Sequence, residues 1–399
     1  MSITKIKDAY LKITELKLVN INGIPELNLT FNDSLNLICG PNGIGKTTIL
    51  DSIAQSFCTA SAFQLKKRAG TTNGQIEIKY SENETIHQST YTTNTFSPFE
   101  RENSNGLFQK ARDIILIHSN RFFVHQVLNS IEKDPVVQEN NVHGRLAGGI
   151  LSNEIKKWFI NRFLFSTHAN SLSQEQLANL ELAKKCFSSL DPRVSFSKVD
   201  ASSFDIYLNS PSGEIPFEYL SSGYKSTLVI LLGLIKEIEY RFKNPQINAV
   251  DYSSIFLIDE IDVHLHPEWQ AKLVLSLKYI FPQAQIIATT HSPHIIQVCL
   301  PSEIIALEYD ENSKVRQRKL DSNLYGFQGW NLEEILIDVM GMTTTKSNLF
   351  NTTLKNFELA LSNDDATSVI THGEKLQEML HPNNELGKII SIQMAPFKP

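Results

Sequence analysis

One stretch of nine residues, "GPNGIGKTT" at 40–48, limits what this chain can fold into more than any other feature. It fits the pattern G-x-x-x-x-G-K-[ST], follows the apolar run "LNLIC", and opens a segment with apolar residues at helical spacing. A strand, a glycine loop and a helix in this order bring backbone N–H groups around a phosphate. The sequence therefore predicts an α/β fold of the P-loop NTPase type.

The same stretch supplies side chains for a nucleotide. We expect Lys46 to reach the β- and γ-phosphates and Thr47 to ligate Mg²⁺, while the helix N-terminus adds a favourable dipole. The predicted nucleotide contacts in this stretch are Asn42, Gly43, Gly45, Lys46, Thr47 and Thr48.

Four short apolar segments each end in glycine or in polar residues. They are "LICG" at 37–40, "LIHSN" at 116–120, "LIDE" at 257–260 and "ATTH" at 288–291. In open α/β sheets, ligands bind outside the carboxyl ends of the strands. We therefore expect these segments to be strands of one mostly parallel sheet, with the chemistry gathered along one edge.

Three side chains at these strand ends are candidates for catalysis or metal binding. Asp259 suits the carboxylate that P-loop enzymes place near Mg²⁺, and Glu260 suits the group that orients or deprotonates the attacking water. His291 lies one strand–helix–strand step beyond Asp259, so it should face the same crevice and contact the γ-phosphate. The nearby His264 and His266 lack a third partner at ligand spacing, and we expect packing and interface roles for them.

A second phosphate-binding candidate is "YLSSGYKS" at 219–226, which precedes the apolar run "TLVILLGLI". Ser221 or Ser222 can cap the helix that begins here, and a helix N-terminus favours a bound phosphate. The segment lies far from the P-loop in the sequence, so it is either a plain helix cap or half of a nucleotide site.

Composition excludes several classes of protein. With a net charge of −6 over 399 residues, a basic protein that coats nucleic acid is not indicated, although a local patch could bind DNA. The longest apolar runs fall short of the roughly 18–20 residues that a membrane span needs, so we expect a cytoplasmic protein without a membrane partner. Metal clusters and disulfides are not expected because the cysteines are far apart: Cys39, Cys58, Cys186 and Cys299.

Patterning along the chain suggests four parts. Residues 1–121 read as a lobe with antiparallel N-terminal strands and the P-loop, and 122–215 as a mainly helical insertion. Residues 216–318 read as the second lobe, and 319–399 as a helical C-terminal tail. In the tail, Asn331 and Glu334 form a capping box. The apolar stripe that follows is expected to be core: Leu332, Ile335, Leu336, Val339 and Met340.

Taken together, these motifs resemble the ATP-binding-cassette (ABC) ATPases. "GPNGIGKTT" is similar to Walker A, "LSSGYKS" to the signature motif and "IFLIDE" to Walker B, with Asp262 at the D-loop position and His291 at that of the switch histidine. The resemblance implies an ABC-ATPase head that binds ATP and Mg²⁺. It adds Ser221, Ser222, Gly223 and Asp262 to the nucleotide contacts. It further implies that the signature of one chain faces the P-loop of a second copy, in a homodimer or higher homo-oligomer.

The segments "LIDEIDVHLHPEWQ" and "ATTHSPHII" narrow the resemblance to the RecF/OLD-like soluble branch. A Toprim-like "EG…E" and "DxD" pair does not follow the switch histidine. The chain therefore resembles stand-alone ATPases of the AAA_21 type from bacterial antiphage operons, in particular the ATPase subunits of Septu systems. This implies a separate HNH-type nuclease as partner, no nuclease activity in this chain, and partner binding by residues 319–399.

Two alternatives stay open. A RecF-like repair ATPase would clamp DNA directly, with "LKKR" (65–68) and "KVRQRK" (314–319) as candidate contacts, although the acidic total argues against tight non-specific binding. A transporter cassette would carry a "DEPTSALD"-type run after Walker B, which is absent here. No Q-loop glutamine can be assigned, since Ser119, Asn120 and Arg121 occupy its position, with Asn120 as a possible substitute.

Overall fold

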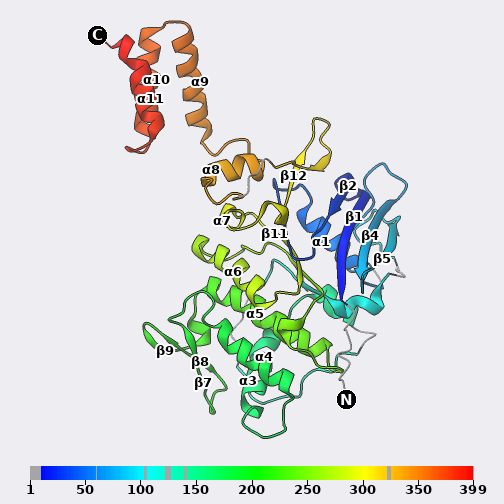
Figure 1. The fold of residues 1–399 in the computed structure, drawn as a ribbon. Coiled ribbons are helices and arrows are strands. Elements are labelled where there is room, and N and C mark those ends of the chain that lie inside the picture. Colours follow the sequence, from blue (N-terminus) through cyan, green and yellow to red (C-terminus); the bar gives the residue numbers. More distant parts are fainter. Residues whose placement is uncertain are drawn as a thin grey trace. The chain divides into compact units, whose positions relative to one another are not determined.

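The computed structural model of the protein describes residues 10–59, 61–102, 106–121, 127–138, 142–320 and 325–398. They form two compact units, Met1–Gly341 and Met342–Pro399. The first unit is an α/β domain whose described residues form three sheets, and the second is a set of three helices (Figure 1). Four parts were predicted from the sequence, and the last of them was expected to begin at residue 319. The second compact unit begins later, at Met342.

The central sheet of the first unit has six strands in the order β13-β12-β3-β11-β10-β6. These strands are β3 (Leu35–Cys39), β6 (Ile114–Ile117), β10 (Ile255–Ile258), β11 (Gln285–Thr289), β12 (Ile304–Tyr309) and β13 (Val315–Gln317). Neighbouring strands run parallel, except that β13 is antiparallel to β12. The four segments expected to share one sheet are the adjacent strands β3, β11, β10 and β6, so that prediction is confirmed.

Both faces of the central sheet are covered, which explains why its strands are apolar throughout. On β3, Ile38 packs into one hydrophobic core and Leu37 into the other. The first core is shared by α1 (Lys46–Gln55) and a four-stranded antiparallel sheet in the order β2-β1-β4-β5. The strands of that sheet are β1 (Leu11–Ile21), β2 (Ile24–Thr30), β4 (Gly74–Glu82) and β5 (Thr85–Thr93).

The second core is built around α5 (Ser222–Arg241), a 20-residue helix that begins at the signature segment. The helix is buried on nearly all sides, which its apolar run "TLVILLGLI" permits. Around it lie elements of the insertion and of the second lobe (Figure 1). These are α3 (Ser152–Phe165), α4 (Gln174–Cys186), α6 (Pro267–Ile280), α7 (Pro293–Gln297) and the small sheet of β7 (Ser195–Val199), β8 (Ile206–Ser210) and β9 (Gly213–Pro216). The remaining helix of the insertion, α2 (Val142–Gly148), instead places Val142 and Leu146 in the first core.

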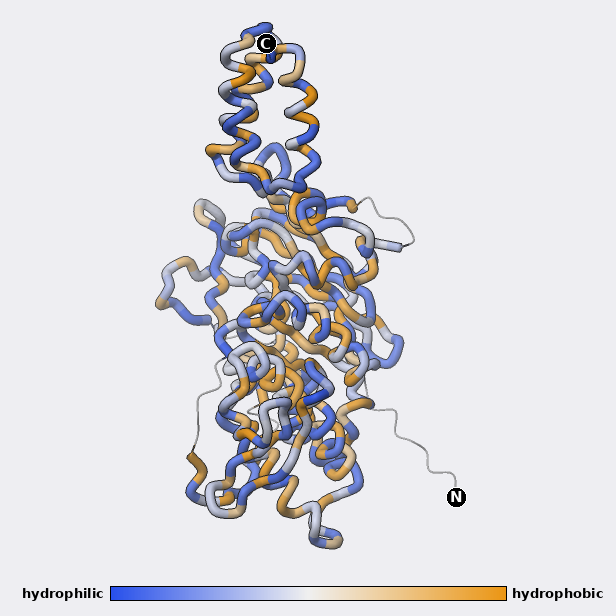
Figure 2. Tube along the Cα trace, turned by 90° about the vertical axis from the view of Figure 1, so that its left-hand side faces the viewer, coloured by the Kyte–Doolittle hydropathy of each residue, from blue (hydrophilic) through white to orange (hydrophobic). Residues whose placement is uncertain are grey.

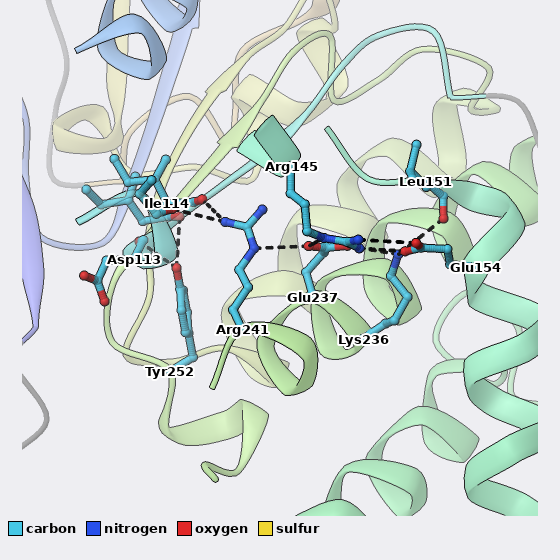
Figure 3. Close-up of polar contacts among 11 residues, drawn as sticks. Asp113, Ile114, Arg145, Leu151, Glu154, Lys236, Glu237, Arg241 and Tyr252 are labelled. Atoms are coloured by element: carbon cyan, nitrogen blue, oxygen red, sulfur yellow. Dashed lines mark hydrogen bonds and ion pairs between the residues drawn. The ribbon is translucent and has the colours of Figure 1, made fainter. Parts of the chain in front are cut away.

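The C-terminal end of α5 is fixed by a buried network of charges (Figure 3). Glu237 accepts hydrogen bonds from Arg145 at 2.6 Å and from Arg241 at 3.1 Å. Glu154 on α3 joins the network through Arg145 and Lys236. Because each buried charge has an opposite partner, the network holds α2, α3 and α5 in a defined arrangement.

Asp113 lies beside this network. Burial raises the pKa of its carboxyl to about 6, against the opposing effect of nearby basic side chains. A carboxyl with a raised pKa stabilises the fold most at low pH, and this contribution is lost as the pH rises through about 6. We expect the advantage of Asp113→Asn in unfolding free energy over the wild type to grow by about 3 kcal/mol between pH 4 and 7. Urea unfolding at several pH values measures this difference, and a difference independent of pH would contradict the assignment.

The segment before the second unit contains the predicted capping box. The Asn331 side chain accepts from the Glu334 backbone N–H at 2.9 Å, and the Glu334 carboxylate accepts from the Asn331 backbone N–H at 2.8 Å. The helix is short, since α8 (Leu332–Glu334) passes into a π-helical turn, Ile335–Val339. Most of the predicted apolar stripe is core as expected, whereas Leu332 is 37% exposed.

The second unit consists of α9 (Asn348–Ser362), α10 (Ala366–Met379) and α11 (Glu385–Met394). Hydrophobic and hydrophilic positions alternate along these helices (Figure 2), as amphipathic packing requires. Their shared core is formed by Phe350, Phe357, Ala360, Val369, Leu376, Ile390 and Met394. The unit therefore has a small hydrophobic core of its own.

Candidate nucleotide-binding site

The P-loop connects β3 to α1 as predicted. Gly45 has φ 103°, and a Cβ added there would lie 2.8 Å from Ile24 Cδ1, so only glycine fits this turn. Lys46 folds back over the loop, where its ammonium donates to the backbone oxygens of Gly40 at 2.9 Å and Pro41 at 3.0 Å. Burial lowers the pKa of Lys46 despite nearby acidic groups. The ammonium thus lies at the mouth of the loop, where phosphate oxygens can replace the carbonyls.

Thr47 and Asp259 meet at the edge of the sheet although they are 212 residues apart. The Thr47 hydroxyl donates to Asp259 Oδ1 at 3.1 Å, and the Thr289 hydroxyl donates to the same oxygen at 2.7 Å. A hydroxyl and a carboxylate are hard oxygen ligands of the kind that Mg²⁺ prefers, so these residues fit the predicted ion. Burial, and secondarily Asp259, raises the pKa of Asp51 on α1 to about 7.

Glu260 has an unusual backbone conformation. Its φ is 45°, in the left-handed region that glycine favours, and its N–H donates to the Thr289 hydroxyl at 2.7 Å. Such a conformation costs about 1–3 kcal/mol in a non-glycine residue and is often found at functional sites. Thr289 therefore ties the positions of Asp259 and Glu260 to the neighbouring strand β11.

Asp262 and His291 are also brought together. Asp262 Oδ1 accepts from the Thr290 hydroxyl at 2.7 Å and from the His291 backbone N–H at 3.0 Å. Burial and the nearby charge of Lys46 lower the pKa of His291, against an opposing effect of the acidic groups. The imidazole is therefore neutral at neutral pH, and it can donate one hydrogen bond to a phosphate oxygen.

The signature segment lies at the N-terminus of α5. Ser221 caps the helix, since its hydroxyl accepts from the Tyr224 N–H at 3.3 Å, and the exposed Ser222 is the first helical residue. A Cβ on Gly223 would lie 2.7 Å from the His264 backbone oxygen, so this close approach requires glycine. Within the described part of the chain, no hydrogen bond or ion pair joins Ser221–Gly223 to the P-loop.

Sequence reasoning missed the part that Arg121 plays. This residue follows β6 and is only 6% exposed. Its guanidinium donates to the backbone oxygens of Asp259 at 2.9 Å and Glu260 at 2.5 Å, and to the Ser226 hydroxyl at 3.2 Å. The sequence placed Ser119, Asn120 and Arg121 at the Q-loop position. The contacts of Arg121 with Asp259 and Glu260 are made to backbone oxygens, which any residue type supplies, so the sequence could not indicate them.

The two candidate histidines before α6 have structural contacts. The Nδ1 atom of His266 accepts from the Glu268 N–H at 3.4 Å at the start of α6, and its ring contacts Trp269. Among the residues described, no cluster of three or more His, Cys, Asp or Glu side chains is arranged to hold a metal ion. The four cysteines are free and buried.

The fold and the site define the class of this protein as a P-loop ATPase of the ABC type. Residues 76–297, more than half of the chain, match the family model described as "AAA domain, putative AbiEii toxin, Type IV TA system", AAA_21. The chain is 45% identical over 390 residues to the Septu protein PtuA of Bacillus thuringiensis, covering 97% of this chain and 98% of that protein.

Two further relatives are more distant. A Septu protein PtuA of Bacillus mycoides (strain KBAB4) is 27% identical over 88% of this chain and 48% of its own length. The "Retron Ec83 probable ATPase" of Escherichia coli is 32% identical over 34% of this chain and 26% of its own length. The chain belongs to the AAA_21 family of ATPases and, within it, to the Septu PtuA proteins. None of the helices in the described ranges has the length and apolar character to cross a membrane.

Proposed function

We propose that this chain is the ATP-hydrolysing regulatory subunit of a bacterial antiphage defence complex, in which a separate HNH-type nuclease cleaves DNA. The observation that carries the proposal is the meeting of Lys46, Thr47, Asp259 and Glu260 at one sheet edge, in a chain related over its length to Septu PtuA. The ATPase class follows from the family. The nuclease partner, and the absence of nuclease activity in this chain, come from the Septu resemblance.

The proposed roles follow from the geometry. Lys46 and the amides of the P-loop bind the β- and γ-phosphates of ATP, and Thr47 with Asp259 would hold Mg²⁺, which neutralises charge on the phosphate oxygens. Glu260 orients the attacking water and accepts its proton. The neutral imidazole of His291 donates a hydrogen bond to the γ-phosphate and is held in place through Asp262.

The site is completed by a second copy of the chain. Ser222 is exposed at the start of a long helix, and each chain carries one P-loop and one signature segment. A two-fold dimer pairs the P-loop of each chain with the signature of the other, which yields two equivalent ATP sites. Ser221, Ser222 and Gly223 would then contact the γ-phosphate held by the partner subunit, where the helix N-terminus is favourable for an anion.

The contacts of the basic clusters argue against direct clamping of DNA. Lys66 Nζ donates to the Glu100 backbone oxygen at 2.6 Å. Arg316 and Arg318 both bind Glu308, each at 2.8 Å. Arg316 and Arg318 thus share an acidic partner, and Lys66 is held by a carbonyl, so fewer charges of the second cluster are free for phosphates.

Activity of the purified chain, alone and with the HNH subunit, tests this function. Lys46→Ala should weaken ATP binding by about 10- to 100-fold, because it removes a charged hydrogen-bond donor to the phosphates. ATP hydrolysis should fall accordingly, and ATP should cease to influence DNA cleavage by the complex. ATP affinity is measured by calorimetry, with Lys184→Ala as the control substitution of a lysine that pairs with Glu181 at 2.7 Å, outside the candidate site. Unchanged affinity would refute the P-loop assignment, and DNA cleavage by the chain alone would refute the division of labour.

A further inference from the structure

Arg121 is a buried cation whose hydrogen bonds go to neutral oxygens. To described residues it donates four bonds, to the carbonyl oxygens of His118, Asp259 and Glu260 and to the Ser226 hydroxyl. Burying a guanidinium is costly, so a residue that only supported packing would be served as well by a neutral side chain. This arrangement indicates a specific task for the charge and the planar fork of Arg121.

The two backbone contacts control the conformation of Glu260. The Asp259 and Glu260 carbonyls belong to the two peptide groups that flank the Glu260 Cα atom. One guanidinium holds both, through Nη1 at 2.9 Å and Nη2 at 2.5 Å. The φ of 45° at Glu260 depends on the relative orientation of these peptide groups. Arg121 therefore helps to fix the direction in which the Glu260 side chain leaves the backbone.

The third contact connects Arg121 to the signature helix. Ser226 lies four residues after Ser222, one turn further along α5, and it is 3% exposed. Its hydroxyl accepts from Arg121 Nε at 3.2 Å. A shift of the signature turn must therefore move the partner of Arg121 by a similar amount.

The other end of α5 is joined to the start of β6 by more bonds. Arg241 donates to the backbone oxygens of Ala111 and Ile114 at the start of β6, and it pairs with Glu237 in the buried network (Figure 3). The segment around β6 thus contacts α5 near both ends of the helix. Arg241 at the end of α5 binds the first residue of β6, and Arg121, which follows β6, binds Ser226 near the start of α5. At the signature end, among the described residues, only the Ser226 hydroxyl bonds to Arg121, so a small shift of this end changes that one bond.

We propose that Arg121 is a positioning residue that makes the orientation of Glu260 depend on the position of the signature helix. The proposal rests on the head-to-tail dimer proposed above. In that dimer, the signature of a chain contacts the ATP of the partner subunit, while Glu260 of the same chain serves the chain's own ATP. Binding of ATP at one site then changes the orientation of Glu260 at the other site, through Ser222, Ser226 and Arg121.

Ser226→Ala tests the link to the signature helix by itself, because it removes one hydroxyl and leaves the contacts of Arg121 with the Asp259 and Glu260 carbonyls. The wild-type protein should hydrolyse ATP with a Hill coefficient above 1. Ser226→Ala should dimerise normally and bind ATP normally, with a Hill coefficient that falls to about 1. Arg121→Lys cannot bridge two carbonyls and a hydroxyl, so kcat should fall about 10- to 100-fold with a small change in KM, because misplacement of a reacting group by about 1 Å has this effect.

Arg241→Lys is the matched control, since it alters the other buried arginine that joins α5 to β6. It should lower the melting temperature and keep the wild-type Hill coefficient. A Hill coefficient of 1 in the wild type, or the wild-type coefficient in Ser226→Ala, would overturn the role of Arg121. Light scattering with ATP on the same samples identifies the other failure: chains that stay monomeric refute the proposed dimer, and the coupling with it.

Discussion

Glu260→Gln should bind ATP, hydrolyse it about 10²- to 10⁴-fold more slowly than the wild type, and remain dimeric while ATP is present. The amide has nearly the shape of the carboxylate, so the contacts of the Glu260 backbone with Thr289 and Arg121 are retained. It cannot accept the proton of the attacking water, and it removes a negative charge next to the γ-phosphate. Both effects should lengthen the lifetime of the ATP-bound dimer.

Phosphate release and light scattering measure the two parts of this prediction. Glu268→Gln is the matched control, because Glu268 is an exposed acid at the start of α6 that pairs with Lys272 at 3.2 Å. The control should hydrolyse ATP at the wild-type rate and should not accumulate as a dimer. Hydrolysis at the wild-type rate by Glu260→Gln would show that Glu260 is not the base, and a monomer with bound ATP would contradict the dimer.

The positions of the candidate site residues along the sheet have local signals in the sequence. Strand ends with short polar clusters can be found by reading along the chain, and the parallel sheet then brings them together without further information. Thus Lys46, Thr47, Asp259 and His291 were expected at one sheet edge because each follows a short apolar strand, and because His291 lies one strand–helix–strand step beyond Asp259. The capping box at Asn331 has the same local character.

The missed features depend on contacts between distant residues. Arg121 bonds to atoms that are 105, 138 and 139 residues away. Thr289 joins Asp259 to Glu260 from a neighbouring strand, and a threonine at a strand end is common enough to carry no signal by itself. Strand β12 and the edge strand β13 were not predicted, because frequent charged residues between 308 and 319 interrupt the apolar pattern there.

The pairing of two chains is the central claim, and complementation between variants tests it. Ser222→Arg should abolish hydrolysis and leave ATP binding to the single chain intact, since Ser222 makes no contact with the P-loop of its own chain. Lys46→Ala should weaken ATP binding by the P-loop and leave the signature segment of the same chain unchanged. A heterodimer of the two variants contains one complete site, formed by the P-loop of the first chain and the signature of the second.

The decisive measurement is ATP hydrolysis by heterodimers purified through two different affinity tags. We expect the pair of Ser222→Arg with Lys46→Ala to recover measurable hydrolysis, at most about half of the wild-type rate, because one of two sites is complete. The rate should lie below half where Glu260 of the Ser222→Arg chain depends on its own signature helix. The matched control joins a wild-type chain to a chain with both substitutions, and this heterodimer should be inactive because neither site is complete. An inactive first pair together with an active second pair would show that each chain completes its own site, and would contradict the account.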